Sequence, residues 1–319
     1  MTNVVSQGYD VGGKPNRESD EFAWLDQSPL VEDVRRLAKS GDPLSDAALM
    51  NVAAKYFFAF VHPGAQVNPV PPREIASILH RFQRCRSLNE PDDDIEIMNI
   101  LRRFAPALAL SARPVVAGHV LGLLAAQFVP GSGGRYLGLD LYTGSGLLVL
   151  GQYLLASRHG YESVEVWGVE GDGVAAKRAG SLLRSLGVGN VVPCAPEYTA
   201  AYEMVGGRRL SLVTSAVGAG GGIGLCDDRF FTAFAALERA CSTSLQGASF
   251  FPEGLIVYSR ETNASLILSR ENGFQRPAEF DGAALQPQAW IVAGDVIPLH
   301  RMGEPPTSLE RQPDKSFNE

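Results

Sequence analysis

The chain has 319 residues, of which 45% are hydrophobic and 20% are charged, as is ordinary for a globular protein with a sizeable core. Its formal net charge of −7 argues against attraction of the whole molecule to nucleic acid or to an anionic membrane. Four widely spaced cysteines without a CxxC pair and five scattered histidines offer no zinc motif, so we expect free thiols and no metal.

The N-terminal segment, residues 1–22, is polar and has no apolar core of signal-peptide length, so we expect a flexible arm. The longest apolar stretches of the chain are interrupted by glycine, proline or charge, which disfavours a membrane span. Together these features lead us to expect a cytoplasmic protein.

Helical patterns follow the arm. Residues 28–42 open with Ser28 as a helix N-cap and Pro29 at the first helical position. Residues 45–61 place apolar side chains on one helical face. Similar patterns cover residues 71–85, 90–108 and 113–128. The sequence therefore predicts an all-helical cap domain over residues 23–130.

After residue 131, short apolar runs alternate with helical patterns. Strands are predicted within residues 136–142, 164–170, 191–196 and 209–216, with helices over 146–160, 174–187 and 228–242 and further strands within 249–261, 264–272 and 289–300. Alternation of strands and helices implies crossover connections and a parallel sheet. We therefore predict an α/β domain over residues 131–302, followed by a polar tail over residues 303–319.

The first predicted strand ends in a glycine-rich turn, "LYTGSG" (residues 141–146), directly before a helix. Ligands of parallel sheets bind at the carboxyl ends of the strands, and a helix N-terminus attracts anionic groups. Glu170 ends the next strand, where a carboxylate can accept both hydroxyls of a ribose. No Gly-Lys-Ser/Thr follows, which excludes a P-loop, and Val149 occupies the third glycine position of a dinucleotide fingerprint.

The stretch "LDLYTGSG" resembles the D/E-x-G-x-G-x-G loop of class I S-adenosylmethionine-dependent methyltransferases, with Asp140 at the acidic position. Glu170 matches the ribose-binding acid of that family, and "LSLVTSAVG" is similar to its fourth strand and active-site loop, with Ser215 at the tip. The resemblance covers about residues 113–272. It implies a Rossmann-like sheet that binds S-adenosylmethionine through Asp140, Leu141, Tyr142, Thr143, Gly144, Gly146, Glu170, Ser215 and Arg113.

Two features qualify the resemblance. The helix pattern "FFTAFAALERACS" before "GASFFPEGLIVYS" is similar to the arginine-methyltransferase branch, which needs two glutamates after its fourth strand. The corresponding loop here, "SAVGAGGGIG", has none, which makes arginine methylation an unfavoured reading. Tyr142 replaces the first glycine of the loop.

The favoured function is methyl transfer to a small molecule, with S-adenosylhomocysteine as the second product. Such a transfer needs alignment more than a catalytic constellation, because the sulfonium is already a good leaving group. The alternative with the same cofactor is aminocarboxypropyl chemistry: cyclisation to azetidine-2-carboxylate with release of methylthioadenosine, or transfer as in nicotianamine synthases. Weaker alternatives are an NAD-linked oxidoreductase and a non-catalytic scaffold.

The candidate catalytic residues are Tyr142, Ser215 and His119. The ring of Tyr142 either packs against helices, or faces the sulfonium or bends the methionine chain. His119, on the helix before the first strand, is a core or surface histidine or an acid–base group. Arg113 either binds the cofactor carboxylate or is a surface arginine, and residues 218–224 form a connection or a lid.

The expected partner is a small-molecule substrate, and neither nucleic acid nor a membrane. The sequence leaves open the acceptor, the general base and the oligomeric state, with a homodimer as one candidate.

Overall fold

The computed structural model describes residues 22, 25, 28–39, 44–61, 114–130, 134–215, 228–259, 261–280, 282 and 285–298. Several sequence-based predictions lie outside these residues: most of the N-terminal arm, the helices over 71–85 and 90–108, Arg113, the side chain of His119, the segment 218–224 and the tail 303–319.

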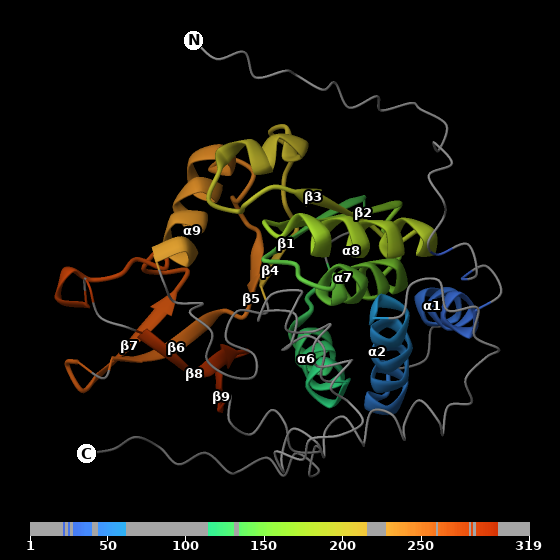
Figure 1. Ribbon diagram of the computed structural model, residues 1–319, viewed down its shortest axis with the longest axis horizontal. Coiled ribbons are helices and arrows are strands. Elements are labelled where there is room, and N and C mark those ends of the chain that lie inside the picture. Colours follow the sequence, from blue (N-terminus) through green and yellow to red (C-terminus); the bar gives the residue numbers. More distant parts are fainter. Residues whose placement is uncertain are drawn as a thin grey trace.

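A five-stranded parallel sheet forms the centre of the described chain (Figure 1). Its strands are β1 (Arg135–Leu141), β2 (Ser163–Glu170), β3 (Asn190–Pro193), β4 (Leu212–Ser215) and β5 (Ser249–Phe251), in the order β3-β2-β1-β4-β5. In β1 every residue after Arg135 is buried, as expected for a central strand covered on both faces. The parallel sheet that the strand–helix alternation predicts is therefore confirmed.

Helices connect the strands of this sheet. They are α7 (Leu147–Arg158), α8 (Gly173–Leu186), the 3₁₀ helix η2 (Thr199–Val205) and α9 (Asp228–Cys241). Helix α8 begins at Asp172, whose carboxylate accepts the backbone N–H groups of Val174 and Ala175, both at 2.9 Å. It ends at Gly187, which takes a left-handed conformation with φ +70°. These local signals fix where α8 starts and stops.

In the described part of the chain, three N-terminal helices pack beside α7 and α8 (Figure 1): α1 (Pro29–Lys39), α2 (Asp46–Val61) and α6 (Pro114–Gln127). The predicted start of α1 is confirmed, because the Ser28 hydroxyl accepts the N–H of Leu30 at 3.2 Å. Helix α7 contacts both α1 and α6 on one side and β1 on the other, and most of its residues are buried. The helical cap thus shares one hydrophobic core with the sheet.

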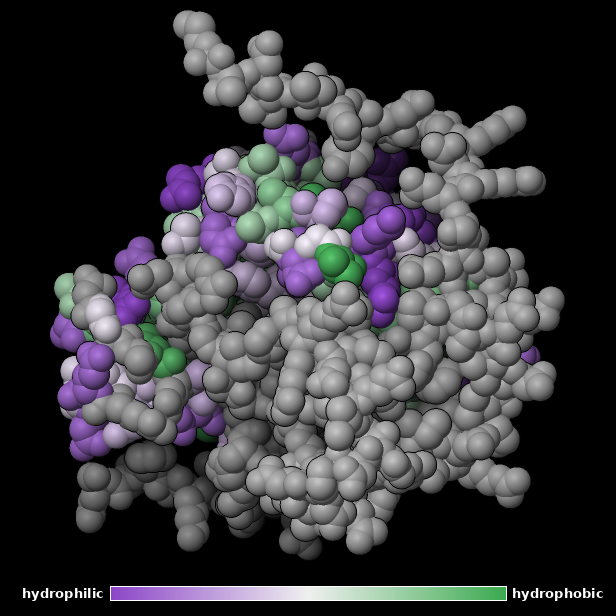
Figure 2. Space-filling view, viewed as in Figure 1, coloured by the Kyte–Doolittle hydropathy of each residue, from purple (hydrophilic) through white to green (hydrophobic). Residues whose placement is uncertain are grey.

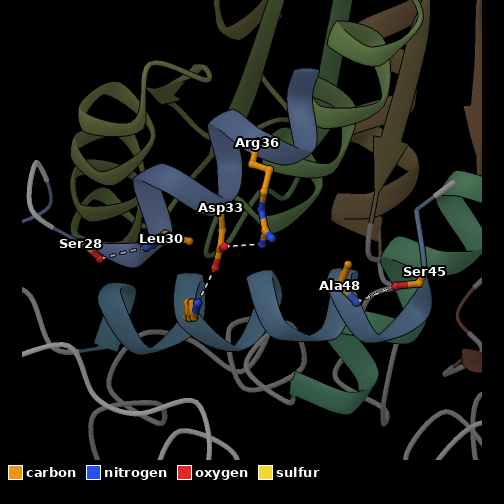
Figure 3. A network of polar contacts seen from close by, with 7 residues as sticks. Ser28, Leu30, Asp33, Arg36, Ser45 and Ala48 are labelled. Carbon is orange, nitrogen blue, oxygen red and sulfur yellow. Dashed lines mark hydrogen bonds and ion pairs between the residues drawn. The ribbon is translucent and has the colours of Figure 1, made fainter. Parts of the chain in front are cut away.

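A buried carboxylate joins the first two helices. Asp33 of α1 forms an ion pair with Arg36 of the same helix at 2.6 Å and a second with Lys55 of α2 (Figure 3). The side chains of Asp33 and Lys55 are only 12% and 11% exposed, so this pair is shielded from water. Because each charge is costly to bury alone, the pair specifies how α1 and α2 align.

The last four strands do not extend the parallel sheet. They are β6 (Gly254–Ser259), β7 (Ala264–Ser269), β8 (Leu285–Val292) and β9 (Asp295–Pro298), and they form a separate antiparallel sheet in the order β7-β6-β8-β9. The connections explain the difference. Parallel neighbours need a crossover of a dozen or more residues, whereas β8 and β9 are joined by Ala293 and Gly294, both with positive φ, as in a tight hairpin.

The two sheets meet at the end of β5. The ring of Phe251 packs edge-on against Trp290 of β8, with centroids 5.4 Å apart, and Trp290 is fully buried. On the face seen in Figure 2, hydrophilic and hydrophobic residues are interspersed over the described part. The large hydrophobic residues that are most exposed, such as Val174 and Tyr198, lie on different elements, as is normal for a protein surface. Within the described ranges, no helix is both long enough and apolar enough to cross a bilayer.

Candidate functional site

The glycine-rich turn lies at the point where the order of the strands in the sheet reverses. From β1 the chain first adds β2 and β3 on one side and later β4 and β5 on the other, so the carboxyl ends of β1 and β4 border the switch point. Open α/β sheets bind ligands at this crevice. The ends of β2 and β4 bring Glu170 and Ser215 to the same edge as the turn, as the sequence predicts.

The backbone of the turn is wound tightly. Tyr142, Gly144 and Gly146 have φ values of +53°, +55° and +85°. The N–H of Thr143 donates to the Val169 carbonyl at 3.1 Å, and the N–H of Gly146 donates to the Thr143 carbonyl at 2.9 Å. Tyr142 adopts the left-handed region although it has a side chain, at a cost of about 1 kcal/mol that glycine would avoid. The surrounding contacts therefore impose this conformation.

Glu170 closes the turn from the neighbouring strand. Its Oε2 accepts the N–H of Gly144 at 2.8 Å, and its Oε1 accepts the N–H of Asp172 at 2.8 Å. Burial raises the pKa of Glu170, while these backbone hydrogen bonds lower it. A third backbone hydrogen bond, from Gly171, also lowers this pKa, so three of the roughly four acceptor positions of the carboxylate are used. The group can therefore accept a further hydrogen bond from a ligand that enters the turn.

Asp140 ends a chain of buried hydrogen bonds that sequence analysis missed. The Tyr136 hydroxyl donates to Gln152 Oε1 at 2.9 Å, Gln152 Nε2 donates to Thr214 Oγ1 at 2.7 Å, and Thr214 donates to Asp140 Oδ1 at 2.7 Å. The four side chains are at most 2% exposed. Every donor points towards Asp140, so the network holds that carboxyl in one orientation.

Gly138 makes room for this network. A Cβ at that position would lie 1.9 Å from Gln152 Oε1, so only glycine lets the amide cross the face of β1. One signal was available in the sequence: Gln152 interrupts the apolar stretch "LLVLGQYLL". A buried glutamine in such a stretch indicates polar partners, but the sequence does not reveal Thr214 as one of them.

The pH dependence of stability follows from Asp140. Burial raises the pKa of Asp140 to about 8, even though hydrogen bonds from Thr214 and Thr143 lower it. The folded chain therefore holds a proton that the unfolded chain, with an aspartate pKa of 3.8, releases. The contribution of this group to the free energy of unfolding is largest below about pH 4. It decreases as pH rises and is lost above about pH 8.

We expect the free energy of unfolding of Asp140→Asn to decrease less with rising pH than that of the parent. Asparagine keeps an acceptor for Thr214 but cannot ionise. Urea unfolding of both proteins between about pH 5 and pH 9 measures the difference. Glu170, whose pKa is also raised, still titrates in both proteins, so a smaller decline remains in Asp140→Asn. Superimposable profiles would contradict the assignment.

Tyr56 of α2 ties the cap to the turn. Its hydroxyl donates to the Ser145 carbonyl at 2.6 Å, and a Cβ on Gly146 would lie 2.7 Å from the same hydroxyl. For Tyr56, the apolar pattern of residues 45–61 predicts only a position on a buried helical face. The contact spans 89 residues, so periodicity gives no hint of it. Because of this bond, the position of the glycine turn depends on the helical cap.

The remaining predicted residues are placed as follows. Thr143 uses its hydroxyl to donate to the Asp140 carbonyl at 2.9 Å, and Ser215 donates to the Leu141 carbonyl at 3.1 Å. Tyr142 is half-buried, and its hydroxyl lies 3.5 Å from Glu197 Oε1 beyond β3. His119 belongs to α6, but its side chain lies outside the described part of the chain, as does Arg113.

The described residues contain no cluster of three or more His, Cys, Asp or Glu side chains that could hold a metal ion. The strand order β3-β2-β1-β4-β5, with a glycine turn after β1 and an acid at the end of β2, is typical of Rossmann-like nucleotide-binding sheets. The fold is similar to that of class I S-adenosylmethionine-dependent methyltransferases.

Solved structures similar to this chain include the Trypanosoma brucei PRMT1 enzyme–prozyme heterotetrameric complex with AdoHcy, with 16% identity and a TM-score of 0.32 over 48% of this chain and 43% of that one. Protein arginine methyltransferase 10 of Arabidopsis thaliana matches with 17% identity and a TM-score of 0.30 over 44% of this chain and 36% of that one. A CurJ carbon methyltransferase matches with 12% identity and a TM-score of 0.27 over 77% of this chain and 52% of that one.

The chain therefore spans about half the length of these proteins, or less. No family model matches the sequence, and no curated protein does either.

Proposed function

We propose that the chain is an S-adenosylmethionine-dependent transferase that methylates a small molecule. The observation that carries the proposal is the pairing of Glu170 with the N–H of Gly144, which fixes a carboxylate at the mouth of a glycine turn. Glycine at 144 and 146 lets a nucleoside approach the backbone, and the remaining acceptor position of Glu170 suits a ribose hydroxyl.

The residues of the turn have distinct roles in this proposal. Asp140, held by Thr214, fixes the end of β1 beneath the turn, while Leu141, Thr143 and the two glycines shape the backbone around the cofactor. Ser215 borders the site and keeps the end of β4 against Leu141 through its hydrogen bond, which makes it a positioning group. Arg113 and His119 are proposed from their positions before the first strand, Arg113 as a partner for the cofactor carboxylate and His119 as an acid–base group.

The cofactor, when bound, supplies an activated methyl group next to a sulfonium. The protein's part is to align the acceptor nucleophile with that methyl group and to exclude water, and any proton that the nucleophile loses passes to a base or to solvent. The half-buried ring of Tyr142 stands at the position of a loop glycine, where it can face the cationic sulfur.

Aminocarboxypropyl chemistry is the second candidate, and Tyr142 is the observation that favours it. The turn holds this bulky ring in a left-handed conformation, with its hydroxyl close to Glu197. A side chain imposed there against its backbone preference suits a site that bends the methionine part of the cofactor, bringing the amine onto the γ-carbon.

Calorimetry followed by mass spectrometry tests both candidates. S-adenosylhomocysteine is expected to bind in a saturable manner and NAD⁺ is not; binding of NAD⁺ alone would overturn the proposal. The chain is then incubated with S-adenosylmethionine alone. Cyclisation needs no acceptor, so methylthioadenosine would accumulate if the second candidate is right. Formation of S-adenosylhomocysteine only after a small-molecule extract is added would support methyl transfer.

A further inference from the structure

A cavity lies at the edge of the sheet where the parallel strands begin, opposite to the edge that carries the glycine turn. It has a volume of about 350 Å³ and is lined by the end of α6 and by the starts of β1, β4 and β5. Seven residues of β1 separate this edge from the glycine turn, about 20 Å along the strand. The cavity is therefore distinct from the site proposed for the cofactor.

Two arginines line this cavity at neighbouring positions. β1 and β4 pair in parallel with Gly138 opposite Leu212, and the N–H of Ser211 donates to the Leu137 carbonyl at 2.8 Å. Continuing this register brings Arg209 next to Arg135, and both residues line the cavity. Both side chains carry a positive charge, which favours an anionic ligand in the cavity.

Within the described part of the chain, no carboxylate forms an ion pair with Arg135 or Arg209, and no Asp or Glu is among the described residues that line the cavity. The Arg209 guanidinium lies close to Gly247, where a Cβ would be 2.4 Å from its Nη2.

Aromatic rings form another part of the wall. The rings of Tyr136 and Tyr161 meet edge to face with centroids 5.2 Å apart, and Phe128 lies 6.0 Å from Tyr136. All three line the cavity, and Ser211 and Ser249 add hydroxyl groups near the arginines. The cavity thus combines a cationic side with a flat apolar side, which is the usual composition of a small-ligand site.

We propose that this cavity binds a small organic anion, namely a planar carbon frame that carries a phosphate or a carboxylate. Arg135 and Arg209 bind the oxyanion, because the guanidinium fork matches both groups with paired hydrogen bonds. The carbon frame lies against the half-buried rings of Phe128 and Tyr161. The volume is at the lower end of the range for small-molecule sites, so a one-ring ligand fits it.

Calorimetry on the full chain tests the proposal with three one-ring probes: phenyl phosphate, benzoate and neutral benzyl alcohol. At least one anion is expected to bind, and the alcohol is not. Arg135→Gln and Arg209→Gln are each expected to weaken binding by about tenfold or more, through the loss of charge-assisted hydrogen bonds. Arg209→Lys keeps the charge but lacks the planar guanidinium. Its affinity for the anion should therefore lie between that of Arg209→Gln and that of the parent.

The control is Arg239→Gln, because Arg239 is an exposed arginine of α9 outside the cavity. It should bind the anion like the parent. Arg135 and Arg209 are themselves exposed, so their replacement leaves the core intact, which thermal unfolding verifies.

Preference for phenyl phosphate identifies phosphate as the recognised group, and preference for benzoate identifies carboxylate. Three results would overturn the proposal: saturable binding of neither anion at millimolar concentration, equal binding of the alcohol, or equal weakening by Arg239→Gln. The measurement is repeated with S-adenosylhomocysteine present. Unchanged affinity for the anion separates this site from the one at the glycine turn, whatever the fate of the proposed methyl transfer.

Discussion

Replacement of Glu170 by glutamine is expected to weaken binding of S-adenosylhomocysteine by about 100-fold, through the loss of charge-assisted hydrogen bonds. Both oxygens of Glu170 accept backbone N–H groups, from Gly144 and from Asp172. A glutamine must turn its NH₂ towards one of them, so one donor then faces another donor. The same change removes the negative charge that strengthens hydrogen bonds from the ribose hydroxyls.

Calorimetry measures this effect, with Glu238→Gln as the matched control. Glu238 is exposed on α9, so its replacement should leave both affinity and melting temperature unchanged. For Glu170→Gln we also expect a lower melting temperature, because the turn loses one of the hydrogen bonds between its backbone and this side chain. A lower melting temperature with unchanged affinity would show that Glu170 only holds the turn, and the proposed ribose contact would then be wrong.

The sequence predicts the parts of this site that lie close together along the chain. The turn at residues 141–146 and the acid at Glu170 belong to consecutive strand–helix units, so parallel pairing alone brings them to one edge. The starts of α1 and α8 follow local capping chemistry, which is also readable from a few neighbouring residues.

The long-range contacts could not be predicted in this way. Tyr56 reaches the Ser145 carbonyl across 89 residues, and Gln152 reaches Thr214 across 62. Each residue looks like part of an apolar helix, because periodicity reports only which face is buried and not what that face meets. The first contact holds the turn against helix α2, and the second holds the hydrogen-bond network of Asp140 in place. The motif alone therefore does not define the geometry of the site.

The antiparallel sheet was missed for a different reason. The strand patterns over residues 254–298 were recognised, but alternation with helices earlier in the chain suggested that they continue the parallel sheet. In the structure, β6 and β7 are joined by a short connection without a helix, which forces antiparallel pairing. The length of a connection, more than the composition of the strands, decides to which sheet they belong.

Tyr142→Gly is expected to weaken binding of S-adenosylmethionine by about tenfold or more while leaving binding of S-adenosylhomocysteine nearly unchanged. The reason is charge: only the first compound carries a sulfonium, and the ring of Tyr142 is the group proposed to face it. The same variant relieves a backbone cost of about 1 kcal/mol at φ +53° and also removes the packing of the ring against the core, so thermal unfolding is measured beside binding.

Tyr142→Phe is the matched control, since it keeps the ring and removes only the hydroxyl. That hydroxyl lies 3.5 Å from Glu197, the outer limit of a hydrogen bond, so little affinity should be lost with either compound. Calorimetry with both compounds on both variants separates the explanations. An equal loss for the two compounds in Tyr142→Gly would mean that the ring packs the turn without sensing charge. Unchanged affinity for both would mean that a glycine serves this turn as well as the tyrosine does, and the case for bending the methionine chain would fall with it.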